Sequence, residues 1–267
     1  MKIIYYYQTF CGLKNILNDD EKPDIIHLSS IHFGENYIHL NNYPPLDSRF
    51  DDVWNDCKLA VKQGIKIVLM IGGAGTAYNV LFSDYKKYYT LLKNTLNAKF
   101  DIISGIDLDI EEEVDLSNIK MLMRDLKKDY PNFTISMAPV QSSLENDSPG
   151  MGGFIYKDLW NSPEGKLIDY FNGQFYGDFD LESYNACIKN GYPPEKVVIG
   201  MLSSQDFDNA LVELKKIKKM YPSFGGVFNW EYYSSPPNPN VNPNLWCKTI
   251  KETLKTTSLN STCYQIQ

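Results

Sequence analysis

Three carboxylate side chains occupy alternate positions in the segment Ser-Gly-Ile-Asp-Leu-Asp-Ile-Glu, residues 104–111. Side chains of a β-strand alternate between its two faces, so Asp107, Asp109 and Glu111 would share one face. Aliphatic residues stand between them and would share the other face. Burying three neighbouring carboxylates costs several kcal/mol per charge unless protons are shared or the charges are used. This strand is therefore where we expect the chemistry of the protein.

The spacing of these three residues, the acidic ladder, suits general acid catalysis. Neighbouring side chains on one face of a strand lie about 7 Å apart, so the three carboxyl groups should titrate as a coupled set. One of them would then stay protonated near neutral pH, as a general acid requires. Glu111, at the end nearest a substrate, is our candidate acid, and Asp109 is the group that orients it.

Two other interpretations of the carboxylates remain open. A solvated acidic edge strand would fit the run 111–113 but not the interleaved aliphatic residues. A magnesium site is conceivable, although no phosphate-cradling loop accompanies it. The glycine-rich segment 72–75 follows an expected strand but lacks the spacing of a dinucleotide-binding loop. We interpret it as a tight turn that allows close approach to a ligand.

Short apolar runs alternate with amphipathic stretches along the chain. The expected strands are 3–7, 25–31, 65–71, 102–111, 133–138, 172–176, 197–202 and 226–230. Helical spacing of apolar residues lies between them, as at 53, 57, 60 and 61, and at 119, 122, 123 and 126. This alternation predicts an α/β fold, a (β/α)8 TIM barrel formed by a single domain over residues 1–267. A doubly wound open sheet is the alternative.

A barrel would orient the acidic ladder. The aliphatic face of its strand would pack on the helices, so the carboxylates would point inward and climb towards the C-terminal mouth. Two long loops, 140–153 and 234–243, would lie at the same rim, where barrel enzymes build their active sites.

The composition limits the possible partners. The chain has 267 residues, of which 43% are apolar, with a net charge of −7 and a pI near 5.1. This charge argues against nucleic acid and anionic membranes as partners, and no apolar run is long enough to span a bilayer. The five cysteines and three histidines lack metal-binding spacing, so we expect no metal, free thiols and structural or surface histidines (His27, His32 and His39).

The acidic ladder resembles the fourth-strand motif Asp-Gly-x-Asp-x-Asp-x-Glu of the family-18 glycoside hydrolases, the chitinases and endo-β-N-acetylglucosaminidases. Other motifs of that family are matched in the same order along nearly the whole chain. The third-strand Ser-x-Gly-Gly resembles residues 70–73, and the Ala-Pro after the fifth strand resembles 138–139. The sixth-strand Gln-Phe-Tyr-Asn resembles 174–177, and the eighth-strand Gly-Gly-x-x-x-Trp resembles 225–230.

The resemblance implies hydrolysis of β-1,4-linked N-acetylglucosamine with retention of configuration. In that scheme the acetamide oxygen of the substrate itself attacks the anomeric carbon. Glu111 would protonate the leaving oxygen and then act as base on the incoming water. Asp109 would bind the acetamide nitrogen, and Asp107 would share a proton with Asp109 beneath it.

The remaining motifs imply substrate-binding residues. Tyr176 would position the acetamide oxygen, with Gln174 beside it. Trp230 would form the apolar floor on which the sugar ring stacks, and Gly72 and Gly73 would allow the substrate to approach closely. No cofactor is implied.

Three positions depart from the family motifs. Ser104 stands where the fourth-strand motif begins with Asp, Met70 replaces the third-strand Ser, and Gly177 replaces the Asn or Asp after the sixth-strand Tyr. The missing hydroxyl at Met70 would alter the proton sharing of Asp107. We expect these changes to affect rate and pH optimum rather than the presence of a catalytic acid.

These inferences predict a chitinase-like, endo-acting glycosidase whose partner is chitin or another N-acetylglucosamine-containing oligosaccharide. One helix fills the stretch 202–226, which leaves no room for an insertion domain and predicts a shallow, open cleft. An endoglycosidase for the chitobiose core of N-glycans and a catalytically weak chitin-binding lectin are the alternatives. The family resemblance implies secretion, although the N-terminus lacks the cleavage pattern of a signal peptide.

Overall fold

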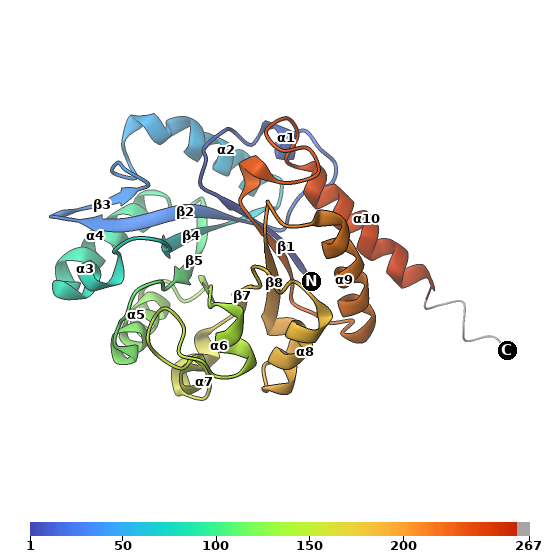
Figure 1. Ribbon diagram of the computed structural model, residues 1–267. Helices are drawn as coiled ribbons and strands as arrows, with labels where there is room; N and C mark the ends of the chain where they lie inside the picture. The colour runs from blue at the N-terminus through green and yellow to red at the C-terminus, as the bar shows by residue number, and fades with distance from the viewer. Residues whose placement is uncertain (261–267) are drawn as a thin grey trace.

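The computed structural model describes residues 1–260, and side chains up to residue 255. Strands and helices alternate along almost all of this length (Figure 1). The strands are β1 (Lys2–Tyr7), β2 (Ile25–Gly34), β3 (Tyr37–Leu40), β4 (Lys66–Gly72), β5 (Ile103–Asp109), β6 (Thr134–Met137), β7 (Tyr170–Gln174), β8 (Val197–Leu202) and β9 (Gly226–Trp230). The α-helices are α1 (Lys14–Leu17), α2 (Asp51–Lys62), α3 (Tyr78–Ser83), α4 (Tyr85–Ala98), α5 (Leu116–Asp129), α6 (Gln141–Glu145), α7 (Tyr156–Trp160), α8 (Leu181–Lys189), α9 (Phe207–Met220) and α10 (Leu245–Asn260).

Eight parallel strands, β1, β2 and β4 to β9, close into a barrel. The barrel closes because β1 pairs with both β2 and β9, with Ile4 in register with Ile25 on one side and Phe228 on the other. The predicted (β/α)8 barrel is thus confirmed, and the alternative of an open sheet is wrong. Between β8 and β9 the chain forms only α9 and short connections, as expected for a barrel without an insertion domain there.

One strand was not expected from the sequence. The chain continues β2 beyond the barrel to Gly34, turns at residues 35–36 and returns as the antiparallel strand β3. A two-residue hairpin turn requires positive φ, which Asn36 adopts at 66°. Figure 1 shows this β2–β3 ribbon projecting from the barrel beside α3 and α4.

Two separate apolar layers stabilise the barrel. The outer layer joins the outward side chains of the strands to the helices, where Ile106 and Leu108 of β5 belong to the same cluster as Leu122 and Leu126 of α5. The inner layer is smaller and fills the lower part of the barrel: Ile4, Tyr6, Ile25, Val68, Met70, Tyr170, Val198 and Phe228. The predicted orientation of the fourth barrel strand, aliphatic side outward, is confirmed.

Aspartate side chains mark the starts of several helices. Asp84, Asp115, Asp180 and Asp206 each accept a hydrogen bond from a backbone N–H of the first turn of α4, α5, α8 and α9. Such caps satisfy backbone donors that the helix itself leaves unpaired. Asp115, Asp180 and Asp206 thereby fix where three strand-to-helix loops end, whereas Asp84 lies at the junction of α3 and α4.

The described helices and loops complete this picture. The segment 140–153, expected to be a loop, contains the short helix α6, while 234–243 is mostly irregular. Cys57, Cys187 and Cys247 are buried free thiols and Cys11 is an exposed one, whereas Cys263 lies outside the described residues. Among residues 1–260, none of the helices combines the length and apolarity needed to cross a bilayer.

Candidate active site

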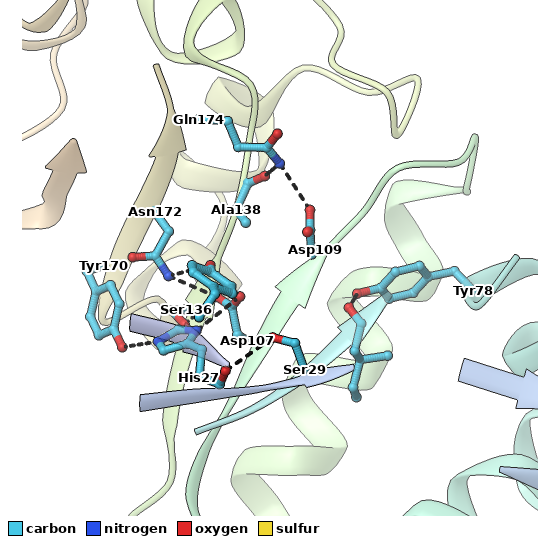
Figure 2. Close-up of polar contacts among 12 residues, drawn as sticks. His27, Ser29, Tyr78, Asp107, Asp109, Ser136, Ala138, Tyr170, Asn172 and Gln174 are labelled. Atoms are coloured by element: carbon cyan, nitrogen blue, oxygen red, sulfur yellow. Dashed lines mark hydrogen bonds and ion pairs between the residues drawn. The ribbon is translucent and has the colours of Figure 1, made fainter. Parts of the chain in front are cut away.

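The acidic ladder points into the barrel, as predicted. Asp107 and Asp109, on β5, are 0% and 5% exposed, and Glu111 lies two residues past the strand end, where it is half-buried. The ladder therefore runs from a dry interior towards the mouth. Figure 2 shows Asp107 deep among polar side chains and Asp109 above it beside Gln174.

Asp107 is held by side chains from four other strands. Its Oδ2 accepts a hydrogen bond of 2.8 Å from the Tyr6 hydroxyl and lies 3.2 Å from Nδ1 of His27. Its Oδ1 accepts hydrogen bonds from Ser136 Oγ at 2.6 Å and Asn172 Nδ2 at 3.2 Å. A buried carboxylate with this many partners is stabilised in its charged form.

The pKa values of the two aspartates of the ladder are shifted in opposite directions. Burial alone would raise the pKa of Asp107, but the contacts with His27, Ser136 and Tyr6 hold that pKa below its usual value. Burial, with the negative charges of Glu111 and Asp107, raises the pKa of Asp109 well above its usual value. The resemblance implied a proton shared between these two aspartates, whereas this structure favours the charged form of Asp107 and a proton higher in the ladder.

Gln174 links the upper two carboxyl groups. Its Nε2 donates to Asp109 Oδ1 at 3.2 Å, to Glu111 Oε1 at 3.4 Å and to the Ala138 carbonyl oxygen at 2.8 Å. Burial raises the pKa of Glu111, which the hydrogen bond from Gln174 partly offsets. A carboxyl group in these surroundings can hold a proton at a higher pH than an exposed glutamate, as a general acid requires.

Tyr176 and Trp230 lie at the top of the inner apolar layer. Both are partly exposed and pack against that layer, and the Trp230 ring centroid lies 5.3 Å from that of Tyr6. Burial and the charges of Asp109 and Glu111 raise the pKa of Tyr176 well above its usual value, so its hydroxyl remains a donor. Their roles as positioning hydroxyl and apolar floor remain predictions.

The predicted glycine turn lies directly against the ladder. Gly72 and Gly73 have φ of 93° and 81°, and the Gly73 amide donates to the Asp109 carbonyl oxygen at 2.9 Å. A Cβ on Gly72 would come within 2.1 Å of that oxygen. The glycines thus allow β4 to approach the end of β5, and their role in substrate binding remains a prediction.

The three departures from the family motifs have separate surroundings. The Ser104 hydroxyl donates to the Ile67 carbonyl oxygen at 3.1 Å, and Met70 fills the inner apolar layer. Gly177 has a φ of 97° with open space where a Cβ would stand. Met70 is in register with Asp107 and offers it no hydroxyl.

Sequence reasoning missed His27. It was assigned a structural or surface role with the other histidines, but it is fully buried and contacts Asp107. Its spacing was the signal that could have found it, because His27 is two residues after the inward-facing Ile25 and therefore shares its face of the strand. His32 and His39 do lie on the β2–β3 ribbon, where their rings stack with centroids 5.8 Å apart. Glu112, by contrast, accepts backbone hydrogen bonds at the start of α3 and is structural.

Known structures resemble this chain over nearly its whole length. A fungal family-18 endo-β-N-acetylglucosaminidase superposes with a TM-score of 0.88 at 29% sequence identity, covering 96% of this chain and 99% of its own. The chitinase ChiC of Aspergillus fumigatus gives 0.83 at 28% identity, covering 95% and 99%. A family-18 chitinase of Pseudoalteromonas aurantia gives 0.74 at 23%, covering 95% and 100%, which supports the fold alone. No protein-family model and no curated protein matches the sequence.

The fold and site define a (β/α)8-barrel enzyme with a row of carboxyl groups rising to its C-terminal mouth. The two structures above 25% identity indicate the class of barrel enzyme. The chain is a glycosidase that resembles the family-18 glycoside hydrolases over nearly its whole length.

Proposed function

We propose that this protein hydrolyses the β-1,4 bond between N-acetylglucosamine residues, with retention and with the substrate's acetamide group as nucleophile. The observation that carries the proposal is the acidic ladder, whose half-buried end, Glu111, has a raised pKa at the barrel mouth. The related endo-β-N-acetylglucosaminidase and chitinase support N-acetylglucosamine-containing substrates.

The first step uses Glu111 as acid. Its carboxyl proton passes to the glycosidic oxygen as the bond to the anomeric carbon breaks, and the acetamide oxygen attacks that carbon to give an oxazolinium ion. Asp109 accepts a hydrogen bond from the acetamide N–H and stabilises the positive charge that develops on the acetamide group. In the second step the Glu111 carboxylate takes a proton from water as the water oxygen bonds to the anomeric carbon. The bond between that carbon and the acetamide oxygen breaks, which restores both the acetamide group and the Glu111 acid.

The surrounding residues orient the sugar. The Tyr176 hydroxyl donates to the acetamide oxygen, which aligns it for attack, and Gln174 holds the two upper carboxyl groups in place. Trp230 presents an aromatic face on which a pyranose ring stacks.

Replacing the acid tests this mechanism. In Glu111→Gln, turnover of a fluorogenic chitotriose glycoside should fall by about 10² to 10⁴, because general acid catalysis is lost while the side-chain shape is kept. Glu113→Gln is the matched control, since Glu113 is exposed two residues further on. Turnover of Glu111→Gln close to that of the unmodified protein would exclude the mechanism.

Chitin and the chitobiose core of N-glycans are both candidate substrates. Chitin is our first choice. The short connection between β8 and β9 favours an open cleft, in which the enzyme can cleave within a polymer chain. The N-glycan core is favoured by the similarity to the fungal endo-β-N-acetylglucosaminidase. Digestion of colloidal chitin, run beside a gel-shift assay on ribonuclease B, separates them. Binding to chitin without hydrolysis of either substrate would instead indicate a lectin.

A further inference from the structure

His27 is a fully buried titratable group that the steps above do not use. It projects from β2 into the barrel, where its Nδ1 lies 3.2 Å from Asp107 Oδ2 and its Nε2 lies 3.1 Å from the Tyr170 hydroxyl. Figure 2 shows the ring between these two side chains. Among the described side chains, buried Nδ1 has no partner that meets hydrogen-bond geometry. Its 3.2 Å contact with Asp107 Oδ2 is an ion-pair contact, and Asp107 is therefore the acceptor towards which an N–H on Nδ1 would be directed.

The two neighbours of the ring favour the tautomer with its hydrogen on Nδ1, because the Asp107 carboxylate can only accept there and the Tyr170 phenol can donate to Nε2. Burial raises the pKa of Tyr170 far above its usual value, so the phenol keeps its proton and can donate it to Nε2. A neutral imidazole that accepts at Nε2 must carry its hydrogen on Nδ1. An imidazolium would carry one there as well. In either state His27 presents an N–H to Asp107.

The other groups around His27 cannot replace it. The titratable side chains facing it are Tyr6 from β1, Asp107 from β5 and Tyr170 from β7. In this layer β4, β8 and β9 contribute apolar side chains, and β6 contributes the hydroxyl of Ser136. Of the described side chains, His27 alone forms an ion-pair contact with Asp107. It is thus the one partner of Asp107 able to carry positive charge.

We propose that His27 is a positioning residue for the acidic ladder, which keeps Asp107 deprotonated so that the working proton stays on Asp109 and Glu111. A carboxylate in a dry interior takes up a proton when donors are removed from it. A neutral Asp107 would no longer repel negative charge on Asp109, so Asp109 would lose its hold on a proton. The consequence for turnover rests on the proposed function, but the effect on Asp107 does not.

Two substitutions of His27 distinguish the loss of the donor at the Nδ1 position from the loss of the side chain's volume. In His27→Asn the amide nitrogen can stand where Nδ1 stands, whereas in His27→Gln it reaches the place of Nε2 and leaves Asp107 without this donor. His39→Asn, on the β2–β3 ribbon outside the barrel, is the matched control. Carbon NMR of labelled aspartate carboxyl groups follows the titration of Asp107, assigned by the signal lost in Asp107→Asn.

We expect Asp107 to titrate about one pH unit or more higher in His27→Gln than in the unmodified protein, and nearly normally in His27→Asn. On the fluorogenic substrate, the acid limb of the kcat profile should move to higher pH in His27→Gln. Its kcat near pH 5 should fall about tenfold, with KM little changed. Removing the donor raises the pKa of Asp107, so activity is lost from the acid side sooner.

Other results would overturn the proposal. Unchanged titration of Asp107 in a folded His27→Gln protein, or equal effects of the Asn and Gln substitutions, would do so. Should His27→Gln fail to fold, Tyr170→Phe provides the same test. It removes the hydroxyl that can donate to Nε2, so His27 can adopt either tautomer, and the pKa of Asp107 should rise by a smaller amount. An unchanged pKa of Asp107 in this variant would contradict the proposal. If the unmodified protein hydrolyses no substrate, the proposed function fails, while the NMR titration still decides the role of His27.

Discussion

Asp109 occupies the least favourable place for a charge in the ladder. It is 5% exposed, lies between two acidic neighbours on the same strand face and faces no cation in an ion pair among the described side chains. Burial and both negative neighbours raise its pKa. A group of this kind is retained at the expense of stability, as is common where function needs a perturbed carboxyl group.

The free energy of unfolding should therefore depend on pH through Asp109. Because the pKa of Asp109 is raised on folding, its protonated form adds stability that is fully present below about pH 4, the unfolded value, and is lost as pH rises through the folded pKa. An asparagine side chain cannot titrate, so Asp109→Asn should melt higher than the unmodified protein at pH 7, by about 2–4 °C for each 1 kcal/mol gained.

Thermal unfolding at pH 7 and pH 3.5 checks this expectation. The advantage of Asp109→Asn should shrink at the lower pH, and turnover should be strongly reduced at both. Asp20→Asn, at an exposed position, serves as the control and should show no such pH dependence. The assignment would be contradicted if the melting temperature of Asp109→Asn, relative to that of the unmodified protein, were lower at pH 7 than at pH 3.5.

At the scale of elements, the close approach of β4 to the end of β5 depends on Gly72. Both Gly72 and Gly64 have left-handed φ, of 93° and 86°, but only Gly72 has backbone atoms where a Cβ would stand. Gly64→Ala should therefore cost about 1–2 kcal/mol from backbone strain alone. Gly72→Ala should cost at least about 3 kcal/mol, because overpacking adds to the strain.

Urea unfolding of the two alanine variants measures the difference. We expect the midpoint of Gly72→Ala to fall further than that of Gly64→Ala, together with reduced turnover, since Asp109 must move with β5. Equal losses of stability in the two variants would show that the clash relaxes at no cost, and that Gly72 serves only the turn.

The same elements show what local pattern can predict. Alternation of acidic and aliphatic residues predicted the orientation of β5, and helical spacing predicted the outer face that α5 covers. The strand β3 escaped prediction because it has only four residues and the two central residues of the preceding turn include no glycine; Asn36 supplies the positive φ. The expected strands at 102–111 and 172–176 also end earlier, at Asp109 and Gln174, because their last residues leave the sheet.

At the scale of the whole molecule, the site was only partly predictable. Its upper part lies in motifs that can be read along the chain: Glu111, Gln174, Tyr176 and Trp230. The partners of Asp107 cannot be read in that way, because each comes from a different strand, and Asn172 and Tyr6 are 166 residues apart. Alternation along each strand can show which side chains point inward, but only the pairing of strands distant in sequence brings these particular side chains together.

Closure of the barrel has a consequence for biosynthesis. The first strand of the chain finds one of its two neighbours only when residues 226–229 have been made, since Lys2 pairs with Gly226. Until then the ribosome-bound chain has an unsealed sheet, and water reaches the carboxyl groups that the finished barrel dehydrates. A nascent chain that stops short of β9 should thus contain every acidic group of the ladder and yet have ordinary carboxylates, with no acid fit to cleave a glycoside.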